Sequence, residues 1–166
     1  MNNRNKSTDS IPITTDSVRS FWQKNPLCAN SIPYRNGSRE YFEQYDKLRE
    51  EIESSSYSYS LHEYSEFKGK MVLDVGSGNG YVLSKYAREG ANVYGIDITD
   101  VGIKLCRERF EHFGIKGNFK VADAQDIPFQ DNTFDCVCSM GVLHHVPNTS
   151  KALDEIYRVL KPGGRL

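Results

Sequence analysis

The sequence Val72-Leu73-Asp74-Val75-Gly76-Ser77-Gly78-Asn79-Gly80 joins an apolar run to three closely spaced glycines. The nearly continuous apolar run over residues 70–75 predicts a strand that is covered on both faces. Residues 81–89 have a helical pattern, which ends at Gly90. Glycines between a strand and a helix let the backbone approach a ligand closely, because they have no Cβ. The helix N-terminus behind the loop suits a polar or anionic group.

Strands and helices alternate through the rest of this segment. The pattern predicts a helix that is capped by Thr99 or Asp100 and ends at Gly114. One face of this helix carries Ile103, Cys106, Phe110 and Phe113. The pattern predicts further strands over residues 92–97, 118–122 and 134–139, and a last helix over 148–160 that ends at Lys161-Pro162-Gly163-Gly164. Such alternation predicts an α/β fold, with a parallel sheet, right-handed crossovers and helices on both faces.

Three regions follow one another along the chain. Residues 1–16 are polar, and we expect a disordered tail. Residues 17–60 form a helical N-terminal extension, in which Tyr41, Tyr45, Leu48 and Ile52 recur at helical spacing after a possible N-cap at Ser38. We interpret the Ser/Tyr stretch over residues 54–60 as a linker. Residues 61–166 form the main domain.

Composition limits the classes of function. The chain has 166 residues and a formal net charge of −1, which argues against a large nucleic-acid footprint. Its apolar runs are too short to span a membrane, and its polar N-terminus lacks the apolar region of a secretory signal, so we expect a cytoplasmic location. The cysteines at positions 28, 106, 136 and 138 match no common zinc pattern, so we expect core side chains and no metal site.

Three details limit the class of ligand that the glycine loop could bind. The spacing is GxGxG, whereas dinucleotide-binding loops have GxGxxG. Asp74 ends the first strand, where a carboxylate repels a pyrophosphate but suits an ammonium group; a capping role for Asp74 stays open. Asp97 ends the second strand, 21 residues after Gly76, where an acid can accept hydrogen bonds from ribose hydroxyls. A ligand with a ribose, a cationic amine and no phosphate is predicted. S-adenosylmethionine (SAM) fits this description, and a dehydrogenase is disfavoured.

Five segments together resemble the motifs of class I SAM-dependent methyltransferases, in the small-molecule group that includes ubiquinone/menaquinone C-methyltransferases. These segments are residues 72–80, 94–98, 121–129, 134–146 and 160–166. The resemblance implies a Rossmann-like fold and SAM-dependent methyl transfer to a small-molecule acceptor by in-line displacement. The Asn/Asp-Pro-Pro-aromatic element of enzymes that methylate amines of nucleic acids is replaced by Ser139-Met140-Gly141-Val142, which argues against a DNA adenine or protein amide substrate.

The resemblance also implies a role for particular residues. The methionine part of SAM would lie on Asp74, Gly76, Ser77, Gly78 and Gly80. Asp97 would hold the ribose, Ile98 would pack on the adenine, Asp123 and Ala124 would meet the adenine edge, and Ser139 and Met140 would lie beside the reacting end. Asp123 has a second possible role, as a cap of the following turn.

Methyl transfer from a sulfonium needs alignment and exclusion of water, and it needs a base only if the acceptor must lose a proton. His144 and His145 are the candidates for that base, with packing as the alternative, so no catalytic residue is assigned. Phe21, Trp22 and Tyr41 or Tyr45 either form a lid over the cofactor, with cation–π contact to the sulfonium, or pack against the sheet.

A complete member of this class has seven strands, in the order 3-2-1-4-5-7-6. We expect strands one to four here, with strands five to seven missing and the chain truncated at its C-terminus. Strand four would then be an exposed edge that favours self-association, and the activity of the isolated chain would be doubtful. A non-catalytic SAM-binding or protein-interaction remnant is the alternative to an active enzyme.

Overall fold

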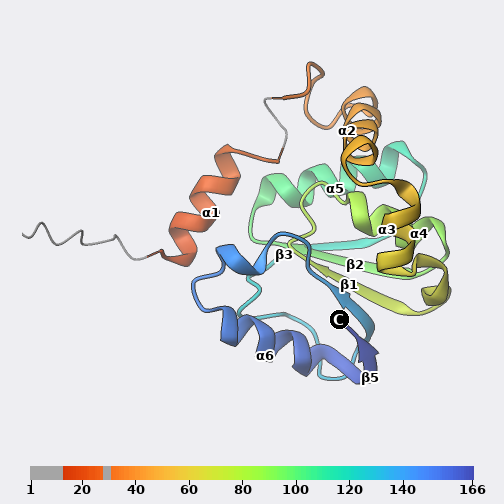
Figure 1. The fold of residues 1–166 in the computed structure, drawn as a ribbon. Helices are drawn as coiled ribbons and strands as arrows, with labels where there is room; N and C mark the ends of the chain where they lie inside the picture. Colours follow the sequence, from red (N-terminus) through yellow and green to blue (C-terminus); the bar gives the residue numbers. More distant parts are fainter. Residues whose placement is uncertain (1–12, 28–30) are drawn as a thin grey trace, which may run out of the picture.

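The computed structural model describes residues 13–27 and 31–166. Its centre is a parallel sheet of five strands in the order β3-β2-β1-β4-β5 (Figure 1). The strands are β1 (Met71–Val75), β2 (Asn92–Asp97), β3 (Asn118–Val121), β4 (Phe134–Cys138) and β5 (Leu160–Arg165). The predicted α/β fold with a parallel sheet is therefore confirmed.

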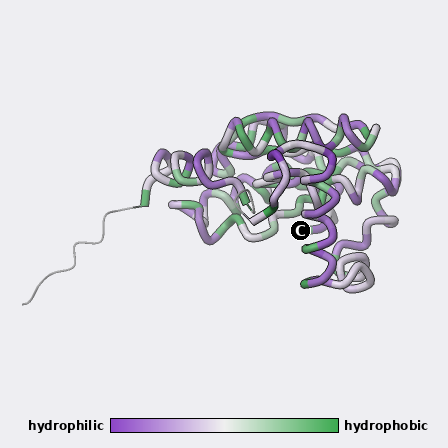
Figure 2. Tube along the Cα trace, turned by 90° about the horizontal axis from the view of Figure 1, so that it is seen from above, coloured by the Kyte–Doolittle hydropathy of each residue, from purple (hydrophilic) through white to green (hydrophobic). Residues whose placement is uncertain are grey.

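Helices cover both faces of the sheet, as the alternating pattern predicts (Figure 1). One face carries α2 (Arg39–Ile52), α4 (Tyr81–Arg88) and α5 (Asp100–His112), and the other carries α6 (Thr149–Val159). Figure 2 shows hydrophobic and hydrophilic residues interspersed along the helical turns of the chain, as expected for helices that pack on one side. Successive β1 residues point to opposite faces, so Val72 packs in the first core and Leu73 in the second. Asp74 therefore shares the face covered by α2 and α4.

The fifth strand corrects the expectation that only four strands are present. β5 pairs with β4, so β4 is an interior strand, and our expectation of self-association through its exposed edge was wrong. Leu160 already has extended backbone, with φ −78° and ψ 134°, so the chain passes from α6 into the strand without a loop. Pro162 does end the helical pattern, but a proline is compatible with an edge strand.

The N-terminal extension is more helical than the sequence predicts. It contains most of α1 (Thr15–Lys24), all of α2 and most of α3 (Ser55–His62), and the 3₁₀ turn η1 (Tyr64–Phe67) follows it. The prediction of a linker over residues 54–60 was wrong, because most of these residues belong to α3. Ser54 caps this helix by accepting from the Tyr57 amide at 3.3 Å, and the Ser58 and Tyr64 hydroxyls are hydrogen-bonded at 3.0 Å. We expected a disordered tail over residues 1–16. Residues 1–12 of that segment lie outside the described residues.

Some features are absent from the part of the chain that the structure describes. Across residues 13–27 and 31–166, every helix is too short or too polar to cross a membrane. The same residues contain no cluster of His, Cys, Asp or Glu arranged to hold a metal ion. Cys106, Cys136 and Cys138 are buried free thiols, and Cys28 lies outside the described residues.

Candidate functional site

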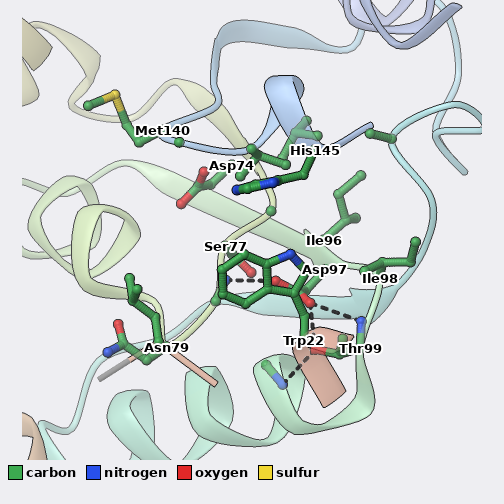
Figure 3. A pocket seen from close by; sticks show the side chains of 18 of the residues that line it. Trp22, Asp74, Ser77, Asn79, Ile96, Asp97, Ile98, Thr99, Met140 and His145 are labelled. Carbon is green, nitrogen blue, oxygen red and sulfur yellow. Dashed lines mark hydrogen bonds between the residues drawn. The ribbon is translucent and has the colours of Figure 1, made fainter. Parts of the chain in front are cut away.

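A cavity of about 500 Å3 opens at the carboxyl ends of the central strands, beneath α1 and α2. This size is within the range of small-molecule sites. Figure 3 shows side chains from the first two strand ends, the glycine loop, α1 and the loop after β4 gathered around it. Nine residues that the sequence singled out line this cavity: Asp74, Gly76, Ser77, Gly78, Asp97, Ile98, Asp123, Ala124 and Met140.

Gly76 and Gly78 of the loop lack a side chain for different structural reasons. Gly76 has φ +80°, and a Cβ there would lie 2.3 Å from a methyl carbon of Val142, so this glycine allows the loop after β4 to approach. Gly78 has φ +51°, and a Cβ there would meet nothing within 4 Å. Gly78 is thus the position at which the backbone faces open space in the cavity.

Asp97 organises the floor of the cavity. Its Oδ2 accepts from the Gly78 amide at 3.0 Å, while Oδ1 accepts from the Thr99 amide at 2.9 Å and the Thr99 hydroxyl at 2.7 Å. Thr99, one of the two residues that the sequence offered as a cap, is the N-cap of α5 and accepts from the Gly102 amide. A carboxylate offers about four acceptor sites, so the three protein donors leave one acceptor site for a ligand hydroxyl.

Asp74 is an acid in an apolar setting. Its exposed fraction is 4%, and it lies beside Cys138 on the neighbouring strand. Burial raises the pKa of Asp74 to about 7; a hydrogen bond with Cys138 opposes this, and the charge of Asp97 adds to it. The buried carboxylate would be ionised more readily beside a cationic ligand group.

Asp123 both lines the cavity and caps a turn. Its Oδ1 accepts from the Gln125 amide at 2.9 Å, which is the arrangement of an Asx turn. Gln125 in turn donates through Nε2 to the Thr15 hydroxyl at 3.0 Å. The segment after β3 is therefore fastened to the start of α1.

Two of the predicted site residues lie outside the lining of the cavity. Gly80 is the N-cap of α4 with φ +76°, and a Cβ there would lie 2.6 Å from the Cys106 sulfur. The Ser139 hydroxyl donates to the Val75 carbonyl at 3.0 Å. Gly80 thus packs the loop against α5, and Ser139 joins the ends of β1 and β4.

The N-terminal helices form a roof over the cavity. Val18 and Trp22 of α1 and Tyr45 of α2 line it. The Trp22 ring contacts His145 edge-on, with centroids 5.2 Å apart (Figure 3). His145 ends the 3₁₀ turn η2 (Leu143–His145) and lines the cavity; partial burial, with a contribution from His144, lowers its pKa.

Polar atoms without partners mark this cavity. The Ser77 Oγ, the Asn79 Nδ2 and the Arg49 Nε are buried and have no hydrogen bond within the described residues, and all three residues line the cavity. Buried polar atoms are normally satisfied. The orphaned atoms, together with the open space at Gly78, fit a ligand that has both donors and acceptors.

Sequence reasoning missed Arg49 and the supporting role of Asn79. Arg49 lies in the last turns of α2, where a basic residue is common and carries no signal of its own. Asn79 stands within the quoted motif, but its Oδ1 accepts from the Tyr81 amide at 3.2 Å, an arrangement that only the folded loop reveals.

Comparisons with known proteins agree with this geometry. A family model described as a methyltransferase domain matches residues 73–166. The ubiquinone/menaquinone biosynthesis C-methyltransferase UbiE of Citrobacter koseri is 44% identical over 104 residues, which are 60% of this chain and 41% of that protein. The chain thus spans about two fifths of the length of the curated relatives that it matches.

Solved structures resemble the same fold. A putative methyltransferase from Bacillus halodurans is 34% identical with a TM-score of 0.61, over 66% of this chain and 48% of that one. The cyclase SpnF is 23% identical with a TM-score of 0.67, over 93% of this chain and 60% of that one, a likeness of fold alone. Because the family match spans more than half of the residues and contains the glycine loop and the acidic strand ends, the chain belongs to the class I SAM-dependent methyltransferases.

Proposed function

We propose that the protein transfers a methyl group from SAM to a small-molecule acceptor. The observation that carries the proposal is a single cavity in which Asp74, Asp97 and Asp123 surround the glycine loop. Three carboxylates beside the loop disfavour a pyrophosphate and favour a ligand with a cationic amine and hydroxyl donors.

The residues of the chain would hold the cofactor along its length. Asp74 would accept from the ammonium group, and the remaining acceptor site of Asp97 would take a ribose hydroxyl. Ile98 would pack on the adenine, with Asp123 and Ala124 at its edge. Gly78 would allow the ligand to approach the backbone.

Bound SAM supplies an activated methyl group on a positively charged sulfur. The chain needs no acid at the departing sulfur, because that sulfur leaves as a neutral thioether. Trp22, Val18 and Tyr45 would exclude water from the reacting end. If the acceptor must lose a proton, His145, which lines the cavity, would accept it at a ring nitrogen; its lowered pKa favours the neutral imidazole that this role needs.

A methyl-transfer assay with labelled SAM tests the proposal. The panel contains phenolic and quinone-precursor acceptors, with a tRNA, a duplex DNA and an unfolded protein as the competing classes. Label in a small-molecule product supports the proposal, and label confined to nucleic acid or protein contradicts it. SAM binding without transfer to any acceptor would support the non-catalytic alternative.

A further inference from the structure

Cys138 of β4 is the neighbour of Asp74 within the sheet. The two residues are Cα partners in the parallel pairing of β1 with β4, and adjacent strands lie about 4.8 Å apart. Cys138 packs in the same hydrophobic core as Val72, and Val72 shares its face of β1 with Asp74, because the two positions differ by two. The thiol and the carboxylate therefore stand side by side on one face of the sheet.

Both side chains are buried, and the thiol keeps its proton. Asp74 is 4% exposed and Cys138 is 8% exposed. Burial raises the pKa of the Cys138 thiol well above its ordinary value, and the charge of Asp74 raises it further, so the thiol is a hydrogen-bond donor at neutral pH. Burial also raises the pKa of Asp74, and the hydrogen bond with Cys138 opposes that change, because a donor stabilises the ionised carboxylate.

Other charged and titratable groups surround Asp74 within the sheet and across the cavity. Among the described residues they are Asp97 of β2, Cys136 of β4, Cys106 of α5, Tyr45 and Arg49 of α2, Tyr81 of α4, Asp123 and His145. The charge of Asp97 raises the pKa of Asp74 and so disfavours its ionised form. The Cys138 thiol thus acts against both burial and the charge of Asp97.

Asp74 lines the cofactor cavity, whereas Cys138 lies outside its lining. A ligand in the cavity would therefore meet the carboxylate and not the thiol. We propose that Cys138 is a positioning residue of the cofactor site, whose thiol donates to the Asp74 carboxylate and keeps it ionised for the ammonium group of SAM. This inference rests on the proposed function, and it gives a chemical role to a residue that the sequence indicates only as a core side chain.

The first measurement follows Asp74 itself, without a ligand. Carbon-13 NMR of chains labelled at the aspartate carboxyl carbons gives the pH midpoint of Asp74, and Asp74→Asn identifies its signal. Cys138→Ala removes the donor and should move this midpoint upward by about 0.5 to 1 pH unit. Cys138→Val, which also lacks a donor but fills the space, should behave in the same way. Cys138→Ser restores a donor, so its midpoint should not rise.

The second measurement shows whether the donor matters to the cofactor. Calorimetry compares each variant with the unaltered chain at the same pH, so that the titration of the amine of SAM cancels. Cys138→Ala should bind SAM about three- to eightfold more weakly at about pH 6.5, because fewer Asp74 side chains are ionised there. At about pH 8.5 the two affinities should agree within about twofold. A defect of packing alone would persist at both pH values.

Cys136 provides the matched control. It lies on the same strand and in the same core as Cys138, one pair earlier, opposite Val72. Neither Cys136→Ala nor Cys136→Ser should move the Asp74 midpoint or alter the pH dependence of SAM binding. If Cys138→Ala and Cys138→Val left the midpoint unchanged, or weakened SAM binding equally at both pH values, the role of Cys138 would be overturned while the proposed function stood. If the midpoint moved but the unaltered chain bound no SAM, the proposed function would fall, and this role with it.

Discussion

Arg109 of α5 and Asp46 of α2 form an ion pair at 2.7 Å, with the Arg109 side chain fully buried. The Arg109 Nε also donates to the Asn79 carbonyl at 2.7 Å, and its guanidinium lies over the Phe42 ring at 4.7 Å. One side chain therefore fastens α2 to the glycine loop. The roof of the cavity and its floor are joined through this arginine.

Asp46→Ala should destabilise the fold by about 3 kcal/mol, because it leaves a buried guanidinium without its counter-ion. Burial raises the pKa of Asp46, although Arg109 opposes that change. Burying the pair therefore costs free energy, and removing only one partner leaves the other charge buried and unpaired. Urea unfolding measures the effect. Glu43→Ala is the matched control on the same helix: it breaks the exposed pair with Arg39, for which about 0–1 kcal/mol is expected. Equal effects of the two variants would refute the role of Arg109.

The affinity for SAM should fall as the pH decreases through about 7, because the ammonium requires an ionised Asp74 whose pKa burial raises to about 7. Between about pH 7.5 and about pH 5.5, the fall should exceed roughly tenfold. Calorimetry at several pH values measures it, and Asp74→Asn should bind weakly at every pH. An affinity of the unaltered chain that does not depend on pH in this range would contradict the assignment.

The stability of the ligand-free chain should change in the opposite direction. Because the folded pKa of Asp74 lies above the ordinary value of 3.8, the folded state holds a proton that the unfolded state has lost. Its contribution to stability is present below about pH 4 and is lost as the pH rises to about 7, with a slope of at most about 1.4 kcal/mol per pH unit. Urea unfolding of the unaltered chain and of Asp74→Asn isolates this contribution, which should vanish in the variant. A steeper loss in the variant would be inconsistent with a raised pKa.

Gly78→Ala should weaken SAM binding by about tenfold or more, because a Cβ would occupy the open space that the ligand approaches. Gly69→Ala is the control for backbone strain: Gly69 also has positive φ and an open Cβ direction but lies outside the cavity lining. Both variants should lose about 1 kcal/mol of stability. Similar SAM affinities in the two variants would show that the ligand does not approach Gly78.

Asp97→Ala should weaken SAM binding by about tenfold or more, through the lost ribose contact and the lost Gly78 and Thr99 hydrogen bonds. Comparison with adenine alone, which lacks the ribose, isolates the ribose contact. The variant should bind adenine as the unaltered chain does. An unchanged SAM affinity in a folded Asp97→Ala chain would show that Asp97 is not the ribose ligand.

The sequence predicts the sheet and its acidic strand ends because both follow from local patterns. Apolar runs identify the central strands, and the position of an acid at a strand end places Asp74 and Asp97 at one edge. α3 was missed because a Ser/Tyr run has weak helical propensity and the helix depends on contacts such as that of the Tyr86 hydroxyl with the His62 carbonyl. Arg49 was missed because its place in the cavity depends on the docking of α2, which the Asp46–Arg109 pair holds across 63 positions of sequence.

The central claim is that the cavity binds SAM. Calorimetric titration of the chain under identical conditions with SAM, S-adenosylhomocysteine and NAD tests this claim most directly. The cavity combines the glycine loop with carboxylates at three strand ends, so we expect SAM and its demethylated product to bind and NAD to bind at least tenfold more weakly, because its pyrophosphate would face these acids. Binding of NAD as tight as that of SAM, or tighter, would contradict the account.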